Sequence, residues 1–149
     1  MSRIGFYHLT KSPLERALPK LLEKALGAGN RCVVLCGSKE RVAALDSMLW
    51  TYDPDSWLPH GQARDGEPSQ HPIWLTDQDE NPNRADVLVL VDGMTSESLG
   101  SYARCLDLFD GQDEAALAAA RARWKATKEA GHELEYWQQD EKSGWIKAQ

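Results

Sequence analysis

The sequence is poor in the residues that build covalent or metal-bound cross-links. It has three cysteines (Cys32, Cys36 and Cys105), an odd number, in a chain of 149 residues that is long enough to fold around a hydrophobic core without disulfides. Cys32 and Cys36 lie four residues apart in an expected strand, so they point the same way and are too far apart to bridge. Reduced thiols are typical of the cytoplasm, where we expect this protein. The four histidines show no metal-ligand spacing, and no metal site is predicted.

Long hydrophobic runs and a surplus of positive charge are also absent. No stretch approaches the length of a membrane span, and residues 1–7 hold one cation and no apolar run, so neither membrane insertion nor a signal peptide is predicted. Seventeen basic and 23 acidic residues give a net charge of −6. A protein held on DNA mainly by phosphate contacts needs a cationic surplus, so DNA contact is expected to be indirect.

Catalytic and cofactor motifs are missing as well. The nearest approach to a phosphate-binding loop is residues 35–39, which have one glycine and fit a capped helix start better. Residues 77–81 begin like a calcium loop, but Pro82 and Leu88 stand where that loop needs glycine and glutamate. No Gly-x-Ser-x-Gly elbow is present, and we interpret His60 as a histidine bonded to loop backbone rather than a catalytic one. We therefore expect a protein that is not an enzyme and has no cofactor.

What the sequence does contain is an alternation of strand-like and helix-like segments. Apolar runs at residues 31–36 and 85–91 are typical of strands buried on both faces of a parallel sheet. Alternation of such strands with helices indicates βαβ units. The pattern predicts one α/β domain of three layers over residues 1–149, with a mostly parallel sheet. The expected strands are 3–9, 31–36, 72–76, 85–91, 104–109, 133–139 and 144–148, the last two as an edge hairpin. The expected helices are 13–26, 39–50 and 111–130, with a turn at 96–101 and a polar loop at 61–70.

Local signals set the ends of these helices. Ser12 is expected to cap the first helix, and Pro19 to kink or restart it. Asp110 can cap the third helix with Asp113 adding a carboxylate to its first turn, and Gly131 can close that helix.

The third helix also has two different faces. Stepping 100° per residue puts Ala116, Ala119, Ala126 and Ala130 on one side, which we expect to pack on the sheet. Leu117, Arg121, Trp124, Lys125 and Lys128 then face water on the other side. Arg123 lies on the alanine side, where it would need to snorkel or form a buried pair. A tryptophan among cations is either an incidental exposed aromatic or a recognition surface for a carboxylate beside an apolar group.

Short motifs in order along the whole chain are similar to the chi subunit of bacterial DNA polymerase III. They are Phe6-Tyr7, Leu45-Asp46 through Leu49-Trp50, Pro59-His60, Pro72-Ile73, Arg121-x-Arg-Trp-Lys125 and Gly131-His132. The resemblance implies a Rossmann-like fold and a non-catalytic accessory subunit. Such a subunit connects the clamp-loader assembly, through a psi subunit, to single-stranded DNA-binding protein, whose acidic tail ending in proline-phenylalanine it grips.

Carried over by position, the resemblance implies a site for that tail. Arg121 would bind the terminal carboxylate, Trp124 would line the apolar pocket, and Lys125, with Lys128 beside it, would attract the acidic residues. The implied aromatic positions that complete the apolar side are Trp50 and Trp57. The chain departs from the family pattern at Leu117, which replaces a lysine, and at Asp110, which replaces an apolar residue.

Two other functions stay open at this point. One is a nucleotide- or small-molecule-binding protein that uses the strand ends near Gly37 and Asp92, because ligands of open parallel sheets favour that edge. The other is a direct single-stranded DNA binder that uses Trp124 and its cations as a stacking platform.

Overall fold

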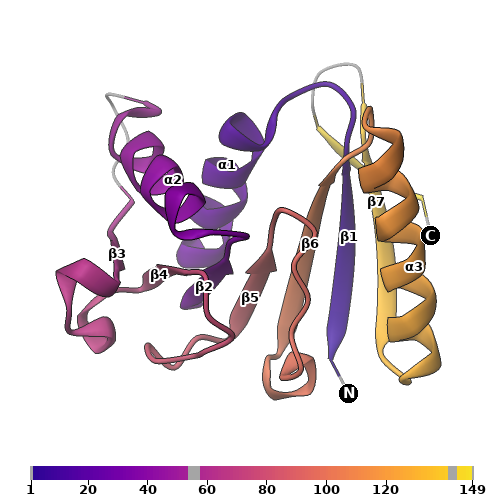
Figure 1. The fold of residues 1–149 in the computed structure, drawn as a ribbon. Helices are drawn as coiled ribbons and strands as arrows, with labels where there is room; N and C mark the ends of the chain where they lie inside the picture. The colour runs from indigo at the N-terminus through magenta and orange to yellow at the C-terminus, as the bar shows by residue number, and fades with distance from the viewer. Residues whose placement is uncertain (1, 54–57, 141–143, 149) are drawn as a thin grey trace.

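The computed structural model describes residues 2–53, 58–140 and 144–148, which form an α/β fold around one eight-stranded sheet (Figure 1). The three-layer, mostly parallel, Rossmann-like architecture expected from the sequence is confirmed. The elements are β1 (Arg3–Leu9), α1 (Leu14–Gly27), β2 (Cys32–Leu35), α2 (Lys39–Thr51), β3 (His60–Gln62), β4 (Ile73–Thr76), β5 (Val87–Leu90), β6 (Arg104–Asp110), α3 (Glu114–Glu129), β7 (Glu133–Gln139) and β8 (Trp145–Lys147), with three 3₁₀ turns, η1 (Ala63–Asp65), η2 (Pro68–Gln70) and η3 (Leu99–Ser101).

The sheet has the strand order β3-β4-β2-β5-β6-β1-β7-β8. Every neighbouring pair is parallel except β7 and β8, which form the expected antiparallel hairpin at the edge. All residues of β2, β4 and β5 are buried, as their apolar sequences predict. Since β1 lies between β6 and β7, the first strand of the chain lies in the half of the sheet that α3 covers.

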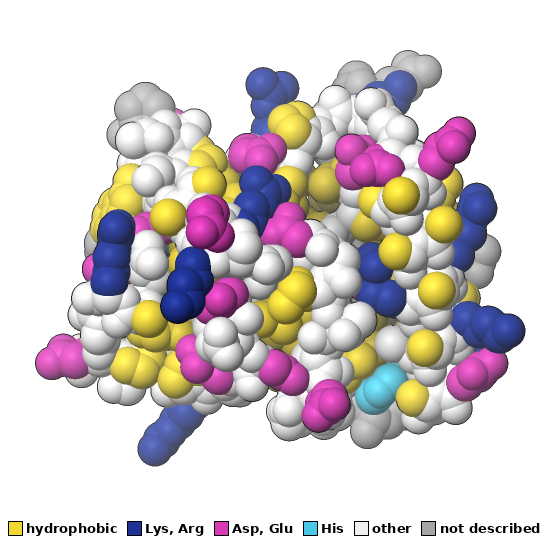
Figure 2. Space-filling view, viewed as in Figure 1, with side chains coloured by type: hydrophobic (Ala, Val, Ile, Leu, Met, Phe, Trp, Pro, Cys, Tyr) yellow, Lys and Arg dark blue, Asp and Glu magenta, His cyan; other side chains and the backbone are white. Residues whose placement is uncertain are grey.

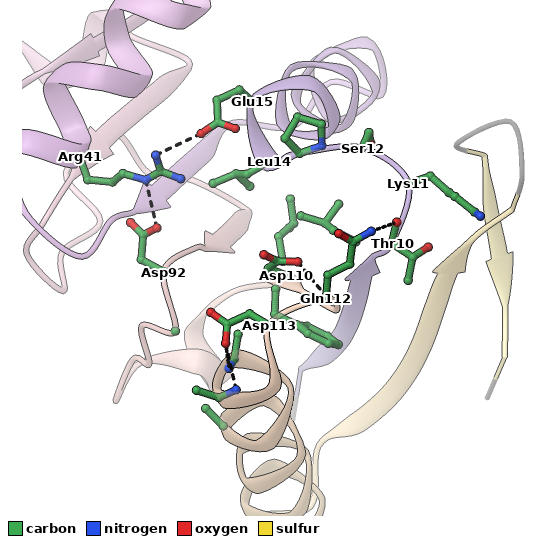
Figure 3. Close-up of a pocket in the computed structure, with 18 of the residues that line it drawn as sticks. Thr10, Lys11, Ser12, Leu14, Glu15, Arg41, Asp92, Asp110, Gln112 and Asp113 are labelled. Carbon is green, nitrogen blue, oxygen red and sulfur yellow. Dashed lines mark hydrogen bonds and ion pairs between the residues drawn. The ribbon is translucent and has the colours of Figure 1, made fainter.

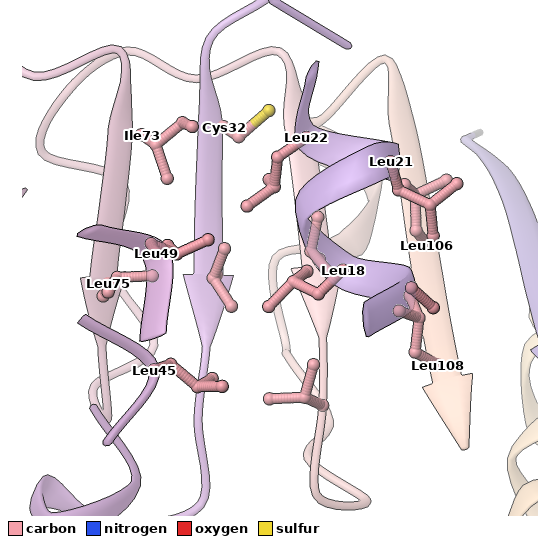
Figure 4. Packing of buried hydrophobic residues seen from close by; sticks show 14 of the residues in the cluster. Leu18, Leu21, Leu22, Cys32, Leu45, Leu49, Ile73, Leu75, Leu106 and Leu108 are labelled. Atoms are coloured by element: carbon pink, nitrogen blue, oxygen red, sulfur yellow. The ribbon is translucent and has the colours of Figure 1, made fainter. Parts of the chain in front are cut away.

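Alternate residues of the central strands pack into two separate hydrophobic cores, one on each face of the sheet. Cys32 and Val34 of β2 face α1 and α2, whose leucines fill the core shown in Figure 4. Val33 and Leu35 face the opposite side, which Ala120 of α3 helps to cover. The helices α1 and α2 therefore lie on one face of the sheet, and α3 lies on the other.

One local expectation was wrong because a strand pairing replaced it. Residues 61–70 are not only a surface loop: their start belongs to β3, a buried strand that pairs with β4. Its polar sequence lacks the apolar pattern that marks a strand. Of the two outcomes expected at Pro19, a kink or a new start of the helix, the new start does not occur: α1 is continuous from Leu14 to Gly27, with the proline buried inside it.

Ser12 does not cap α1. The position before the helix is Pro13, and the Ser12 hydroxyl instead accepts a hydrogen bond from Gln139 Nε2 at 2.7 Å. The side-chain oxygen of the same glutamine accepts the backbone N–H groups of Thr10, Lys11 and Ser12 at 2.9, 2.8 and 3.2 Å. The end of β7 thereby fixes the loop that leads from β1 into α1.

The start of α3 is capped one turn later than Asp110. Asp113 is the cap, and its carboxylate accepts the N–H groups of Ala115 and Ala116. Asp110 instead accepts from the N–H of Gln112 at 2.9 Å, in the turn before the helix. Gly131 follows the helix with φ of +90°, a conformation that glycine adopts without strain, as the sequence predicts.

The packing face of α3 is also different from the expected one. Leu117 and Trp124 are half-buried against the core and Ala120 is 2% exposed, whereas Ala119, Ala126 and Ala130 face solvent. Figure 2 shows the small hydrophobic side chains on the outer side of α3. Burial of a leucine and an indole removes far more apolar area from water than burial of alanines does, and this difference sets the rotation of the helix.

No helix in the described part of the chain is long and apolar enough to cross a membrane.

Candidate functional site

A pocket of about 360 Å³ lies between α3 and the β6-β1-β7 part of the sheet. We call it the α3 pocket. Its lining residues come from four strands or strand ends and one helix: Phe6, Phe109, Leu117, Ala120, Arg121, Trp124, Tyr136, Gln138 and Ala148. Apolar cavities of about 150 Å³ are known to bind benzene, so this pocket has room for a phenyl ring.

Aromatic rings form the walls of the α3 pocket. The Trp124 ring packs edge-on against Phe6, with centroids 5.2 Å apart, and against Tyr136 at 5.9 Å. His8 contacts two of the wall residues. Its ring stacks on Phe109 with centroids 5.1 Å apart, and its Nδ1 lies 2.5 Å from the Tyr136 hydroxyl. Trp124 is thus a half-buried wall of the pocket, held by two ring contacts. An indole packed in this way is less suited to stacking on single-stranded DNA than an open ring face is.

Arg121 supplies a free positive charge at the rim of this pocket. Its side chain is exposed, and within the described residues it makes no hydrogen bond or ion pair. Its charge nevertheless acts on the pocket. Burial raises the pKa of Tyr136, while a hydrogen bond from Gln138 and the charge of Arg121 oppose that rise. The rim therefore combines an unpaired guanidinium with an aromatic wall.

The neighbouring arginine on the same helix is engaged internally. Arg123 forms a bidentate pair with Asp107 of β6, with Nε to Oδ2 at 2.7 Å and Nη2 to Oδ1 at 2.9 Å. The two side chains are 10% and 3% exposed, so this is the buried pair that the sequence allowed for Arg123. Two arginines two residues apart thus have opposite environments, and only Arg121 is available to a ligand.

The structure brings some of the expected site residues together and separates others. Arg121 and Trp124 both line the α3 pocket, and Lys125 and Lys128 are exposed on the same flank of α3 as Arg121. Trp50 does not join them. It lies on α2, which covers the other face of the sheet, where its ring is 54% exposed and 4.4 Å from His60. Trp57 lies outside the described residues.

The sequence did not identify the pocket walls that the strands supply. Phe6, Phe109, Tyr136 and Gln138 come from three strands that become neighbours only through the sheet order. Their shared face follows from period-two alternation along each strand, but the alternation does not tell which strands are adjacent. Leu117 with Ala120 and Trp124 is an i, i+3, i+7 pattern that could have shown the packing face of α3.

A second hollow, of about 790 Å³, opens at the carboxyl ends of β1 and β6 (Figure 3). Hydrogen bonds and ion pairs within the protein engage three of its charged groups, Asp92, Arg41 and Glu15. The Asp92 carboxylate accepts the N–H of Gly37 at 3.0 Å and Arg41 Nε at 3.0 Å, and Arg41 also reaches Glu15 at 3.2 Å. A phosphate at the start of α2 would meet the Asp92 carboxylate, so this edge is poorly suited to a nucleotide.

His60 also has structural partners. Nδ1 of His60 lies 2.7 Å from the Leu58 carbonyl, as the sequence predicted for a histidine bonded to loop backbone, and Nε2 lies 2.7 Å from the Asp46 carboxylate. This contact ties α2 to β3. In the described part of the chain, no group of three or more histidine, cysteine or acidic side chains is placed to hold a metal ion.

Comparison with known proteins identifies the family of this chain. A family model described as "DNA polymerase III chi subunit, HolC" matches residues 1–135. The chain is 27% identical to the DNA polymerase III subunit chi of Haemophilus influenzae over 87% of this chain and 92% of that protein. It is 23% identical to the Escherichia coli subunit over 83% and 84% of the two chains. A probable chi subunit of Rickettsia prowazekii is 33% identical over 61% of this chain and 55% of its own length. The chain therefore belongs to the family of DNA polymerase III chi subunits.

Proposed function

We propose that this chi subunit is a non-catalytic connector that binds the acidic C-terminal tail of single-stranded DNA-binding protein in the α3 pocket. In this proposal the terminal carboxylate pairs with Arg121 and the terminal phenyl ring enters the aromatic pocket beside Trp124. Lys125 and Lys128 attract the acidic residues that precede the terminus. A psi subunit would connect the protein to the clamp loader, and DNA would be reached only through the binding protein.

One observation carries the proposal: an exposed guanidinium with no described partner stands at the rim of an aromatic pocket. A chain terminus that ends in an aromatic residue offers a carboxylate and a ring joined through one Cα, which matches this pair of features. The three exposed cations of α3 lie on a chain with a net charge of −6. Such a local positive patch suits a short acidic peptide better than a long polyanion.

The expected affinity is modest. A hydrogen bond to a charged group contributes about 1.5–3 kcal/mol, and burial of an aromatic ring contributes a similar amount. Ordering of a flexible tail opposes these gains, so we expect a dissociation constant near the micromolar range, about −8 kcal/mol.

The test is a titration of an acidic peptide ending in Pro-Phe against wild type and Arg121→Ala, each with a free and an amidated peptide terminus. We expect Arg121→Ala and amidation each to weaken binding by roughly 10- to 150-fold, the range for loss of one charged contact. Together they should weaken it little further, because both remove the same pair. Arg16→Ala, which removes an exposed arginine from α1 on the other face of the sheet, is the matched control and should bind like wild type.

Full binding by Arg121→Ala would contradict the proposal. An equal loss on amidation in wild type and Arg121→Ala would also contradict it, since the carboxylate would then bind elsewhere.

A further inference from the structure

The sheet surface beside the α3 pocket continues past α3 onto β7 and β8. In the antiparallel pair, Gln138 lies opposite Ile146, and the N–H of Ala148 bonds to the Tyr136 carbonyl at 2.7 Å. Residues directly opposite each other on neighbouring strands share a face of the sheet. Ile146 and Ala148 therefore lie on the face that carries Tyr136 and Gln138 of the pocket.

Ile146 is an unusual residue for this position. Its side chain is 55% exposed, and in the described part of the chain only Trp50 is a comparably exposed large hydrophobic residue. An apolar residue on an exposed edge strand is a liability for aggregation, and natural sheets more often place charged residues there. On the opposite face of the same strand, Lys147 pairs with Glu135 at 3.1 Å. Ile146 thus adds an exposed apolar surface next to Gln138 and Ala148, which line the pocket.

The spacing of an extended chain relates this surface to a ligand in the pocket. Successive residues of such a chain are about 3.3 Å apart along its axis, and neighbouring strands of a sheet are about 4.8 Å apart. When the terminal side chain lies over Tyr136 on β7, the preceding residue can lie over β8. Lys125 and Lys128, which are exposed on α3, would then attract the acidic residues that precede it.

We infer that Gln138, Ile146 and Ala148 form a second subsite, a shelf that receives the residue before the C-terminal one in the bound peptide. Ile146 makes this subsite selective for an apolar residue. The inference rests on the proposed function and adds a specificity determinant from β8 to a site that α3 otherwise dominates.

The experiment is a double-mutant cycle between Ile146 and the peptide. Ile146→Thr keeps a β-branched side chain on the edge strand and reduces its apolar surface. The probes are acidic peptides with free carboxylates that end in Pro-Phe or in Ser-Phe. We expect Ile146→Thr to weaken the Pro-Phe peptide about fivefold, the loss for one apolar contact of about 40 Å². The Ser-Phe peptide should bind both proteins within about twofold.

Lys147→Thr is the matched control, because it alters the same strand on its other face and should leave the preference for Pro-Phe over Ser-Phe unchanged. Equal binding of Pro-Phe by wild type and Ile146→Thr would overturn the inference, as would an equal loss for both peptides or a lost preference in Lys147→Thr. Arg121→Ala, measured alongside, separates the two proposals. If binding depends on Arg121 but not on Ile146, only the shelf is wrong; if it depends on neither, the tail site itself is wrong.

Discussion

Arg123→Met is the substitution for which the structure gives the sharpest expectation. It leaves the Asp107 carboxylate, 3% exposed, without the two short hydrogen bonds that it now accepts. Loss of one partner from a buried pair costs about 3–5 kcal/mol, because an unpaired charge remains in the interior. For a chain of this size, such a loss lowers the midpoint of thermal unfolding by roughly 6–20 °C. Urea unfolding followed by circular dichroism measures the free energy directly.

The effect of Arg123→Met should also depend on pH. Burial raises the pKa of Asp107, and Arg123 opposes that rise, so removal of the arginine raises this pKa further. A carboxyl whose pKa is higher in the folded state than in the unfolded one binds protons preferentially when folded, so stability falls as pH rises through the interval between the two values. The deficit of Arg123→Met relative to wild type should therefore be larger at neutral pH than in acid, where Asp107 binds a proton in the folded protein.

Two controls define the interpretation. Arg121→Ala removes an exposed arginine from the same helix and should change the free energy of unfolding by less than about 0.5 kcal/mol. Arg123→Met combined with Asp107→Leu removes both charges and should recover most of the loss, since apolar replacements of buried pairs are often neutral. If Arg123→Met unfolds like wild type, or if its deficit does not change with pH, the buried pair does not stabilise the fold as we reason.

Two further predictions concern other parts of the fold. Burial raises the pKa of Cys32, Cys36 and Cys105 each to about 12. At pH 8 the thiols of the folded protein should therefore not react with iodoacetamide, whereas all three should react in urea. Rapid modification without denaturant, measured by mass spectrometry, would contradict the buried placement. Gln139→Ala leaves the N–H groups of Thr10, Lys11 and Ser12 without their shared acceptor. Urea unfolding should show a free energy of unfolding lower by about 1–3 kcal/mol. Wild-type stability of this variant would show that water replaces the glutamine at no cost.

The candidate site could be predicted from the sequence where its residues lie on one helix. Arg121 and Trp124 are separated by three residues, so helical periodicity alone puts them on one flank, and the structure places both at the α3 pocket. The expectation that alanines pack and Trp124 faces water was wrong. Amphipathic patterns are ambiguous when small apolar residues occupy one face and large apolar residues are mixed with cations on the other.

Trp50 shows the opposite case. Its position on an aromatic motif suggested a place beside Trp124, but α2 and α3 cover opposite faces of the sheet. Which face a helix covers depends on the handedness of each crossover and on strand order, and neither is encoded within the helix.

The sequence by itself determined the strands other than β3, the three helices, the capped helix start that follows residues 35–37 and the helix end at Gly131, because hydrophobic periodicity and backbone preferences act over a few residues. Only the tertiary structure decided that β1 lies between β6 and β7, that Phe6, Phe109 and Tyr136 become one pocket wall, and that Arg123 is buried while Arg121 stays free. The first two outcomes depend on contacts between residues more than one hundred positions apart, and the third depends on the pairing of α3 with β6 through Arg123 and Asp107. They are settled by which arrangement of the whole chain buries the most apolar surface with its polar groups paired.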